Sequence, residues 1–273
     1  MRRLALLLSL PAVLFAAPQT RDVSLQSADG FTLRGTLTLP EGPGKHPVVI
    51  LAHQFRSDRS GWGTLPEKLQ QRGVATLALD LRGHGASTQK DGVTVAVSDD
   101  FDASAKAVGF AQIPDDLVLA AAWVRKQPGI NPRRVGLAGS SVGATSVLLA
   151  APRIHPIAVL ALSPGGNTHG IAEAAGQAHA AVMVMAALGD KTAAEAATAL
   201  KPVLGTYVRT FEGNDHGFAF LKDHTDVMNV FLAEYLTRRD YAPSPNKTTK
   251  SEAPSNVVTN ETLKAGTAVE AVK

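Results

Sequence analysis

The chain has 273 residues, a formal net charge of +3 at pH 7 and no cysteine. Without cysteine it cannot use disulfides or carry a lipid on a cysteine, so its hydrophobic core must hold the fold alone. Removing the two N-terminal arginines and an evenly charged C-terminal tail leaves about +1, so the charge gives no indication of nucleic-acid binding.

Residues 1–19 have the pattern of a targeting segment. The chain starts Met-Arg-Arg, and residues 4–15 are apolar apart from one serine and one proline. This apolar run is too short to span a bilayer comfortably, which favours a signal peptide, with an uncleaved N-terminal anchor as the alternative. We therefore expect an exported protein, periplasmic or secreted, with no stable membrane association once this segment is cleaved.

The strands expected between residues 20 and 239 are of two kinds. Residues 23–26 and 31–39 alternate apolar and polar side chains around Asp29-Gly30, which predicts an antiparallel hairpin with one exposed face. The later segments are short and almost continuously apolar, as in parallel strands buried on both faces: residues 48–52, 74–79, 134–138, 157–162 and 182–187.

Helical segments are expected between and after these strands. Residues 114–126 open with a proline and two aspartates, which suit a helix N-terminus. The other expected helices cover residues 65–72, 142–150, 192–200 and 227–238. This alternation predicts one α/β domain, a doubly wound sheet with right-handed crossovers, in which ligands bind at the carboxyl ends of the strands.

Residues 240–273 differ in composition from the rest of the chain. They are rich in Ser, Thr, Pro, Asn, Lys and Glu and contain no aromatic residue after Tyr241. A segment of this composition cannot bury enough apolar surface to fold, so we expect a disordered C-terminal tail.

Residues 139–143 read Gly-Ser-Ser-Val-Gly, between an expected strand and an expected helix. Gly-x-Ser-x-Gly in this context indicates a nucleophile elbow, a turn so tight that side chains at the two glycine positions would collide. Only Ser141 fits the register. The pentapeptide alone is a weak signal, and the flanking strand and helix are what make Ser141 a candidate nucleophile.

A serine nucleophile needs a histidine to take its proton. Of eight histidines, His216 has the best position, in a Gly-Asn-Asp-His-Gly loop after the last strand and before the final helix. The alternative is an ordinary surface-loop histidine. With an elbow upstream, we interpret His216 as the catalytic base.

The histidine in turn needs a carboxylate, which in this arrangement lies between serine and histidine in the chain. Asp190 directly follows the apolar run that ends at Gly189, whereas residues 163–168, after the preceding strand, contain no carboxylate. Asp190 is therefore the predicted acid, with a cap of the next helix as its alternative role.

The tetrahedral oxyanion of such a reaction needs two fixed N–H donors. One is expected from Val142, directly after the nucleophile, and the other from the loop after residues 48–52. In that loop Phe55 is the first choice and Gln54 the second. His53 is interpreted as a buried anchor of the same loop.

Four motifs together resemble those of the α/β-hydrolase superfamily: residues 51–55, 79–87, 139–143 and 216–217. The chain has no long insertion between Ser163 and Val182. In this it resembles the lidless, dienelactone-hydrolase-like branch of serine esterases. The resemblance implies the α/β-hydrolase fold over residues 20–239, with a mostly parallel eight-stranded sheet, helices on both faces and no large cap domain.

The chain departs from these relatives at three positions. Gln54 stands where a glycine is common after this histidine, and Thr192 stands where many relatives carry the catalytic aspartate. Dienelactone hydrolases usually have cysteine at the position of Ser141, which argues against dienelactone as the substrate.

Residues 80–85, Asp-Leu-Arg-Gly-His-Gly, combine an acid, a cation and a base. They could form a second active centre. The resemblance implies instead a structural turn that supports the elbow. Arg56, Asp58 and Arg59 follow the oxyanion loop and could line the mouth of the site or form a solvated charged loop.

The pattern as a whole predicts a serine hydrolase, a carboxylesterase that cleaves small or medium soluble esters through an acyl-enzyme, with no cofactor and no metal. The partner is a small-molecule ester, and no nucleic acid is expected. The oligomeric state does not follow from the sequence. Two alternatives are a non-catalytic exported binding protein on a hydrolase fold and a perhydrolase- or haloperoxidase-like activity.

Overall fold

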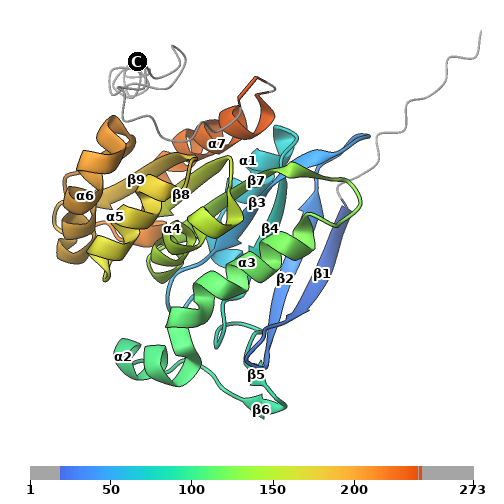
Figure 1. Cartoon of the computed structure of the whole chain (residues 1–273), viewed down its shortest axis with the longest axis horizontal. Coiled ribbons are helices and arrows are strands. Elements are labelled where there is room, and N and C mark those ends of the chain that lie inside the picture. The colour runs from blue at the N-terminus through green and yellow to red at the C-terminus, as the bar shows by residue number, and fades with distance from the viewer. Residues whose placement is uncertain (1–18, 239, 242–273) are drawn as a thin grey trace, which may run out of the picture.

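A computed structural model describes residues 19–238, 240 and 241, which are arranged around one mixed sheet (Figure 1). The strand order is β10-β9-β8-β7-β3-β4-β2-β5-β6, and β1 pairs with β2. Apart from residue 19, the predicted signal peptide or anchor lies outside the described residues. So does the predicted tail from residue 242 onward.

The hairpin expected near the N-terminus is confirmed. β1 (Gln19–Gln26) and β2 (Phe31–Leu39) pair antiparallel, and β2 also pairs antiparallel with β4 (Ala75–Leu79). On β1 only Val23 and Leu25 are buried, so the strand shows the alternation of a sheet with one exposed face.

Six strands form the parallel part of the sheet, and every residue of β8 and β9 is buried. Helices cover both faces of these strands, which explains why their sequences are continuous apolar runs. In chain order these strands are β3 (His46–Ala52), β4, β7 (Ile130–Ser140), β8 (Ala158–Leu162), β9 (Ala181–Ala187) and β10 (Val208–Phe211). The mostly parallel sheet predicted from the sequence is confirmed.

The strand count needs a correction, because the described residues form ten strands rather than eight. The two additional strands are β5 (Gln89–Lys90) and β6 (Val93–Thr94), a small hairpin that pairs with the edge of β2. Strands of two residues are too short to show an apolar alternation, so the sequence pattern could not indicate them.

Two layers of helices cover the sheet (Figure 1). The core on one face includes side chains of α3 (Ile113–Val124), α4 (Val142–Ile154), α5 (Thr168–Gln177) and α6 (Lys191–Leu204). The core on the other face includes side chains of α1 (Leu65–Gln71) and α7 (Leu221–Thr237). The predicted helices are confirmed on both faces, and α5 is one that the sequence pattern did not indicate.

The connection from β4 to α3 is the longest between these elements, yet it forms no large cap. It contains β5, β6, the single-turn α2 (Phe101–Ser104), a π-helical turn (Ala105–Gly109) and a 3-10 turn (Phe110–Gln112). In Figure 1, α2 and the β5–β6 hairpin lie at separate places along the lower edge of the domain.

Among the described residues, one helical run, Phe101–Val124, is long and apolar enough by length and composition to cross a membrane. The core helix of a folded domain passes the same test. Within this run α3 buries Ile113, Leu117 and Val124 against the sheet and its neighbours, so packing accounts for its apolar composition.

Candidate active site

Ser141 occupies the turn between β7 and α4. Its backbone has φ 54° and ψ −116°, a region that residues other than glycine rarely adopt and that stores strain. The Ser141 N–H donates to the carbonyl of Leu162 on the neighbouring strand β8, at 2.8 Å. The strand-turn-helix context expected of a nucleophile elbow is therefore present.

The two glycines of the elbow are required by close backbone contacts. A Cβ at Gly139 would lie 2.3 Å from the carbonyl oxygen of Gly143, across the turn. A Cβ at Gly143 would lie 2.2 Å from the carbonyl oxygen of Ala52, at the end of β3. The contact at Gly139 is the collision within the turn that the motif implies. The contact at Gly143 is a collision with the neighbouring strand β3.

The structure brings Ser141, His216 and Asp190 together from three separate loops. His216 Nε2 lies 2.8 Å from Ser141 Oγ, and His216 Nδ1 lies 2.6 Å from Asp190 Oδ2. Because the carboxylate only accepts, Nδ1 carries the proton and Nε2 is free to accept from the serine hydroxyl. The His216 side chain is 48% exposed and that of Asp190 12% exposed.

Asp190 makes the contacts that both predictions from the sequence require, one to His216 and one at the start of α6. Oδ2 accepts from His216, while Oδ1 accepts from the Ala193 N–H at 3.4 Å, at the start of α6. The preceding residue, Gly189, donates its N–H to the carbonyl of Gly213 at 2.8 Å, so the loops of Asp190 and His216 are joined through their backbones. The helix cap holds the carboxylate in place for the histidine.

The loop that follows His216 is held by hydroxyl and amide groups. The Gly217 N–H donates to Ser163 Oγ at 2.9 Å, and the Phe218 N–H donates to Gln54 Oε1 at 2.8 Å. Ser163 is a residue that sequence reasoning missed, because it carries no carboxylate and so is not a candidate for the acid. Its position directly after a buried parallel strand is the signal that could have indicated it.

Phe55 and Val142, the residues expected to supply the oxyanion donors, lie beyond the ends of adjacent strands. β3 and β7 are paired in parallel with Ala52 opposite Gly139, so both strands end beside the elbow. Val142 is the first residue of α4, where N–H groups lack partners within the helix. The loop of Phe55 makes a tight turn, closed by the Ser57 N–H donating to the Gln54 carbonyl at 3.2 Å.

His53 is fully buried beneath this loop. Its Nε2 accepts from the Leu81 N–H at 2.9 Å, so Nδ1 carries the proton and donates to the Gln54 carbonyl at 2.7 Å. Burial lowers the pKa of His53 to about 4, which keeps the ring neutral at pH 7. His53 is thus a loop anchor, as expected.

The Phe55 ring joins the oxyanion loop to the connection between β4 and α3. Ring centroids of His84, Phe101 and Phe110 lie 5.9, 5.2 and 6.0 Å from that of Phe55. Arg56, which has a positive φ of 58°, pairs with Asp99 at 2.9 Å. This connection therefore packs against the loop on which the site depends.

Residues 80–85 form a closed structural turn rather than a second centre. The Asp80 carboxylate accepts from the N–H groups of Arg59 and Ala86, at 2.8 and 2.9 Å, and Ser87 Oγ donates to the Asp80 carbonyl at 2.7 Å. A Cβ at Gly85 would lie within 2.5 Å of this carboxylate. The turn leaves the carboxylate 3% exposed.

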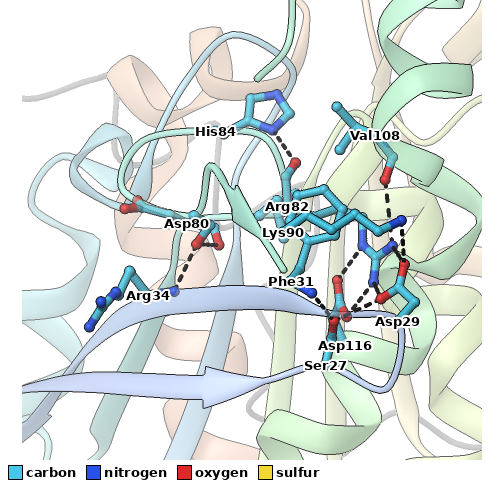
Figure 2. Close-up of polar contacts among 12 residues, drawn as sticks. Ser27, Asp29, Phe31, Arg34, Asp80, Arg82, His84, Lys90, Val108 and Asp116 are labelled. Atoms are coloured by element: carbon cyan, nitrogen blue, oxygen red, sulfur yellow. Dashed lines mark hydrogen bonds and ion pairs between the residues drawn. The ribbon is translucent and has the colours of Figure 1, made fainter. Parts of the chain in front are cut away.

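The Arg82 side chain is also buried and paired within the fold. Its guanidinium, 1% exposed, donates to both oxygens of Asp116 at 2.7 Å and to both oxygens of Asp29 at 2.8 and 3.0 Å (Figure 2). The hydrogen bond from Arg82 lowers the pKa of Asp29 to about 2. Burial raises the pKa of Asp116, although the bonds from Arg82 act in the opposite direction. These contacts tie the first hairpin to α3.

The charged residues after the oxyanion loop have partners of their own. Besides the Arg56 pair, Asp58 accepts from Ser60 at the start of a 3-10 turn (Arg59–Trp62), and Arg59 pairs with Asp80 at 3.4 Å. Within the described part of the chain, no group of three or more His, Asp or Glu side chains could hold a metal ion.

A family model described as "Alpha/beta hydrolase family" matches residues 20–259. The chain is 31% identical over 134 residues to the thiohydrolase aneE of Aspergillus aculeatus, a match that covers 46% of this chain. The matched stretches of the first curated relatives span 36% of the length of those proteins.

Two solved structures share the fold. The dienelactone hydrolase of Anabaena variabilis is 21% identical with a TM-score of 0.61, covering 81% of this chain and 100% of that one. An esterase of Pyrococcus furiosus is 17% identical with a TM-score of 0.59, covering 80% and 91%. The predicted resemblance to the α/β-hydrolase superfamily is confirmed by the family model, and the two structures confirm the fold.

Proposed function

Because the chain belongs to the alpha/beta hydrolase family, we propose that it is a serine hydrolase with Ser141 as nucleophile, His216 as base and Asp190 as acid. The observation that carries this proposal is the unbroken hydrogen-bond chain from Ser141 Oγ through His216 to Asp190 Oδ2. The His216 side chain is 48% exposed and Ser141 is partly exposed, which supports access of a small molecule to the serine.

In this mechanism His216 Nε2 takes the proton of Ser141 as Oγ attacks the carbonyl carbon of an ester. Asp190 keeps Nδ1–H oriented and stabilises the imidazolium that forms. The N–H groups of Phe55 and Val142 stabilise the oxyanion. His216 then gives its proton to the departing alcohol, and a water molecule that it deprotonates releases the acid from the acyl-enzyme.

We propose small or medium soluble carboxylic esters as the substrates. Two observations support this: no large cap is formed by the residues that the structure describes, and an esterase shares the fold. The thiohydrolase among the relatives makes thioesters the second class to assay. We also propose that the protein is exported through residues 1–19, which N-terminal sequencing of the mature protein would test.

The test uses the fully folded protein with two matched variants. Ser141→Ala is expected to abolish turnover of p-nitrophenyl acetate and labelling by a fluorophosphonate probe without lowering the Tm. Ser146→Ala, one turn further along α4, removes a hydroxyl that donates to the Val142 carbonyl, and it is expected to leave both signals close to wild type.

Retained turnover in Ser141→Ala would move the nucleophile elsewhere. A wild-type protein that neither labels nor turns over an ester or thioester would favour the alternative of a non-catalytic binding protein. A rate that depends on added peroxide would favour perhydrolysis.

A further inference from the structure

One side-chain oxygen, Gln54 Oε1, joins three segments that are far apart in the sequence. It accepts from the Phe218 N–H at 2.8 Å and from Ser140 Oγ at 3.1 Å. Gln54 immediately precedes Phe55, Ser140 immediately precedes Ser141, and Phe218 follows His216 by two residues. The oxygen is thus close in the chain to the proposed nucleophile, base and oxyanion donor.

The orientation of the amide is determined by its partners. A backbone N–H can only donate, so the atom facing Phe218 must be the carbonyl oxygen of Gln54 and not its NH2 group. The second lone pair of this oxygen accepts from Ser140, so both acceptor sites are used. The backbone of Gln54 is held as well, because its own carbonyl accepts from His53 Nδ1 and from the Ser57 N–H.

The contact is also closely packed. Gly217 has φ 55°, and a Cβ at this position would lie 2.3 Å from Gln54 Oε1 and 2.6 Å from Ser140 Oγ. The Gly217 N–H donates on its other side to Ser163 Oγ. The backbone after His216 therefore rests on Gln54, Ser140 and Ser163, with no space for it to approach the elbow more closely.

We propose that Gln54 is a positioning residue, whose side-chain oxygen sets the placement of the oxyanion loop relative to the Ser141–His216 pair. This inference rests on the proposed serine-hydrolase function. Removing the acceptor leaves the Phe218 N–H and the Ser140 hydroxyl without their partner, and the loops can then shift. A displacement of about 1 Å in an active site can cost about 100-fold in rate.

The test compares two substitutions of the same residue. Gln54→Leu removes the acceptor, and we expect kcat for p-nitrophenyl acetate and the rate of fluorophosphonate labelling to fall about 10- to 100-fold, with KM within about twofold. Gln54→Glu keeps a side-chain oxygen that accepts both hydrogen bonds, so we expect it to recover most of kcat. Its added negative charge favours protonated His216, so the acid limb of the kcat/KM profile should move to higher pH.

A matched control and a double mutant separate positioning from general stability. Gln70→Leu, on α1, makes the same change at a residue whose amide bonds Thr76 at 3.4 Å, and it should keep wild-type kcat. Ser140→Ala combined with Gln54→Leu should cost less in kcat than the two single effects multiplied, because both remove the same hydrogen bond.

The inference is overturned if Gln54→Leu keeps kcat and labelling within twofold of wild type, or if Gln54→Glu is as impaired as Gln54→Leu. Failure of the proposed function has a different signature, since Ser141→Ala would then turn over ester at the wild-type rate or the wild type would not label. That signature would overturn this inference too.

Discussion

Two polar clusters near the carboxyl ends of the strands both contain aspartate and histidine, but one is mostly buried and the other is partly exposed. The Arg82 cluster, formed by Asp29, Asp80, Arg82, His84 and Asp116, is centred on the turn after β4, and its carboxylates and guanidinium are paired within the fold (Figure 2). The Ser141 cluster, formed by Ser141, Asp190 and His216, follows β7, β9 and β10. Its histidine is 48% exposed, and its two hydrogen bonds run from Ser141 through His216 to Asp190.

An acid, a base and a cation after a strand do not by themselves make an active site. In the Arg82 cluster each carboxylate meets backbone N–H groups or a guanidinium, and the Arg82 side chain is 1% exposed. Its three carboxylates and its guanidinium are all paired within the fold. In the Ser141 cluster, the serine lies on a strained turn beside a half-exposed histidine, which suits the proposed nucleophile.

The largest expected effect separates the aspartates of the two clusters. We expect Asp190→Asn to lower kcat about 10,000-fold with little change in Tm, because an amide no longer holds His216 in the required tautomer. We expect Asp80→Asn to keep kcat within a few-fold and to cost about 1–3 kcal/mol of stability, because one of its two N–H partners loses an acceptor. Ester kinetics and urea unfolding of both variants check this, and near-wild-type kcat in Asp190→Asn would reassign the acid.

The next effect concerns Arg82. Arg82→Met leaves the buried Asp116 without its guanidinium, and we expect a loss of about 3–5 kcal/mol in the free energy of unfolding. Arg153→Met is the matched control, since Arg153 pairs with the adjacent Asp115 where both side chains are about half exposed. That change should cost less than about 1 kcal/mol. Equal losses in urea unfolding would show that burial does not distinguish the two pairs.

A smaller effect is the response to acid of His53, which lies between the clusters. Its pKa is about 4 in the folded protein against an ordinary value of 6.5, so the unfolded chain binds the proton first. Stability should therefore fall as the pH drops from about 6.5 to about 4, by about 3 kcal/mol from this group. Burial also lowers the pKa of His84, which acts in the same direction.

His53→Gln should make the free energy of unfolding less dependent on pH between 6.5 and 4, as measured by urea titration at several pH values. An unchanged slope would mean that His53 is not buried as a neutral ring.

The smallest effect concerns Asp29 at the rim of the Arg82 cluster. Its pKa is about 2 in the folded protein, below the ordinary 3.8, so its contribution is present above about pH 3.8 and is lost as the pH falls toward 2. The side chain is 36% exposed, so solvent screening limits this contribution to about 1 kcal/mol or less. Asp29→Asn should flatten the acid end of the stability curve, and added salt should reduce the difference from wild type. A salt-insensitive difference would contradict this account.

Much of the fold was predictable because its signals are local. Continuous apolar runs identified the parallel strands, and the alternation in β2 identified the hairpin. The five residues around Ser141 identified the elbow, because its tight turn constrains neighbours in the chain. The order of Ser141, Asp190 and His216 along successive loops then made them candidates for one site, and the structure has them in hydrogen-bond contact.

What sequence reasoning missed depends on partners distant in the chain. Gln54 stands where relatives commonly have glycine. Its side chain accepts hydrogen bonds from Ser140 and Phe218, which are 86 and 164 positions away in the chain. Ser163 carries no carboxylate and is therefore no candidate for the acid. Its hydroxyl nevertheless accepts from the Gly217 N–H, 54 positions away. α5 and the β5–β6 hairpin have no strong sequence pattern of their own. α5 packs against α4 and α6, and the hairpin pairs with β2.

The α/β alternation, the elbow and the candidates for nucleophile, base and acid can be inferred from the sequence alone, because turn sterics and apolar periodicity act over a few residues. Which polar residues are buried and paired within the fold, as Arg82 and Asp80 are, and which stay exposed, as His216 does, follows only from the tertiary structure. The difference depends on burial and on hydrogen bonds between segments that only folding brings together.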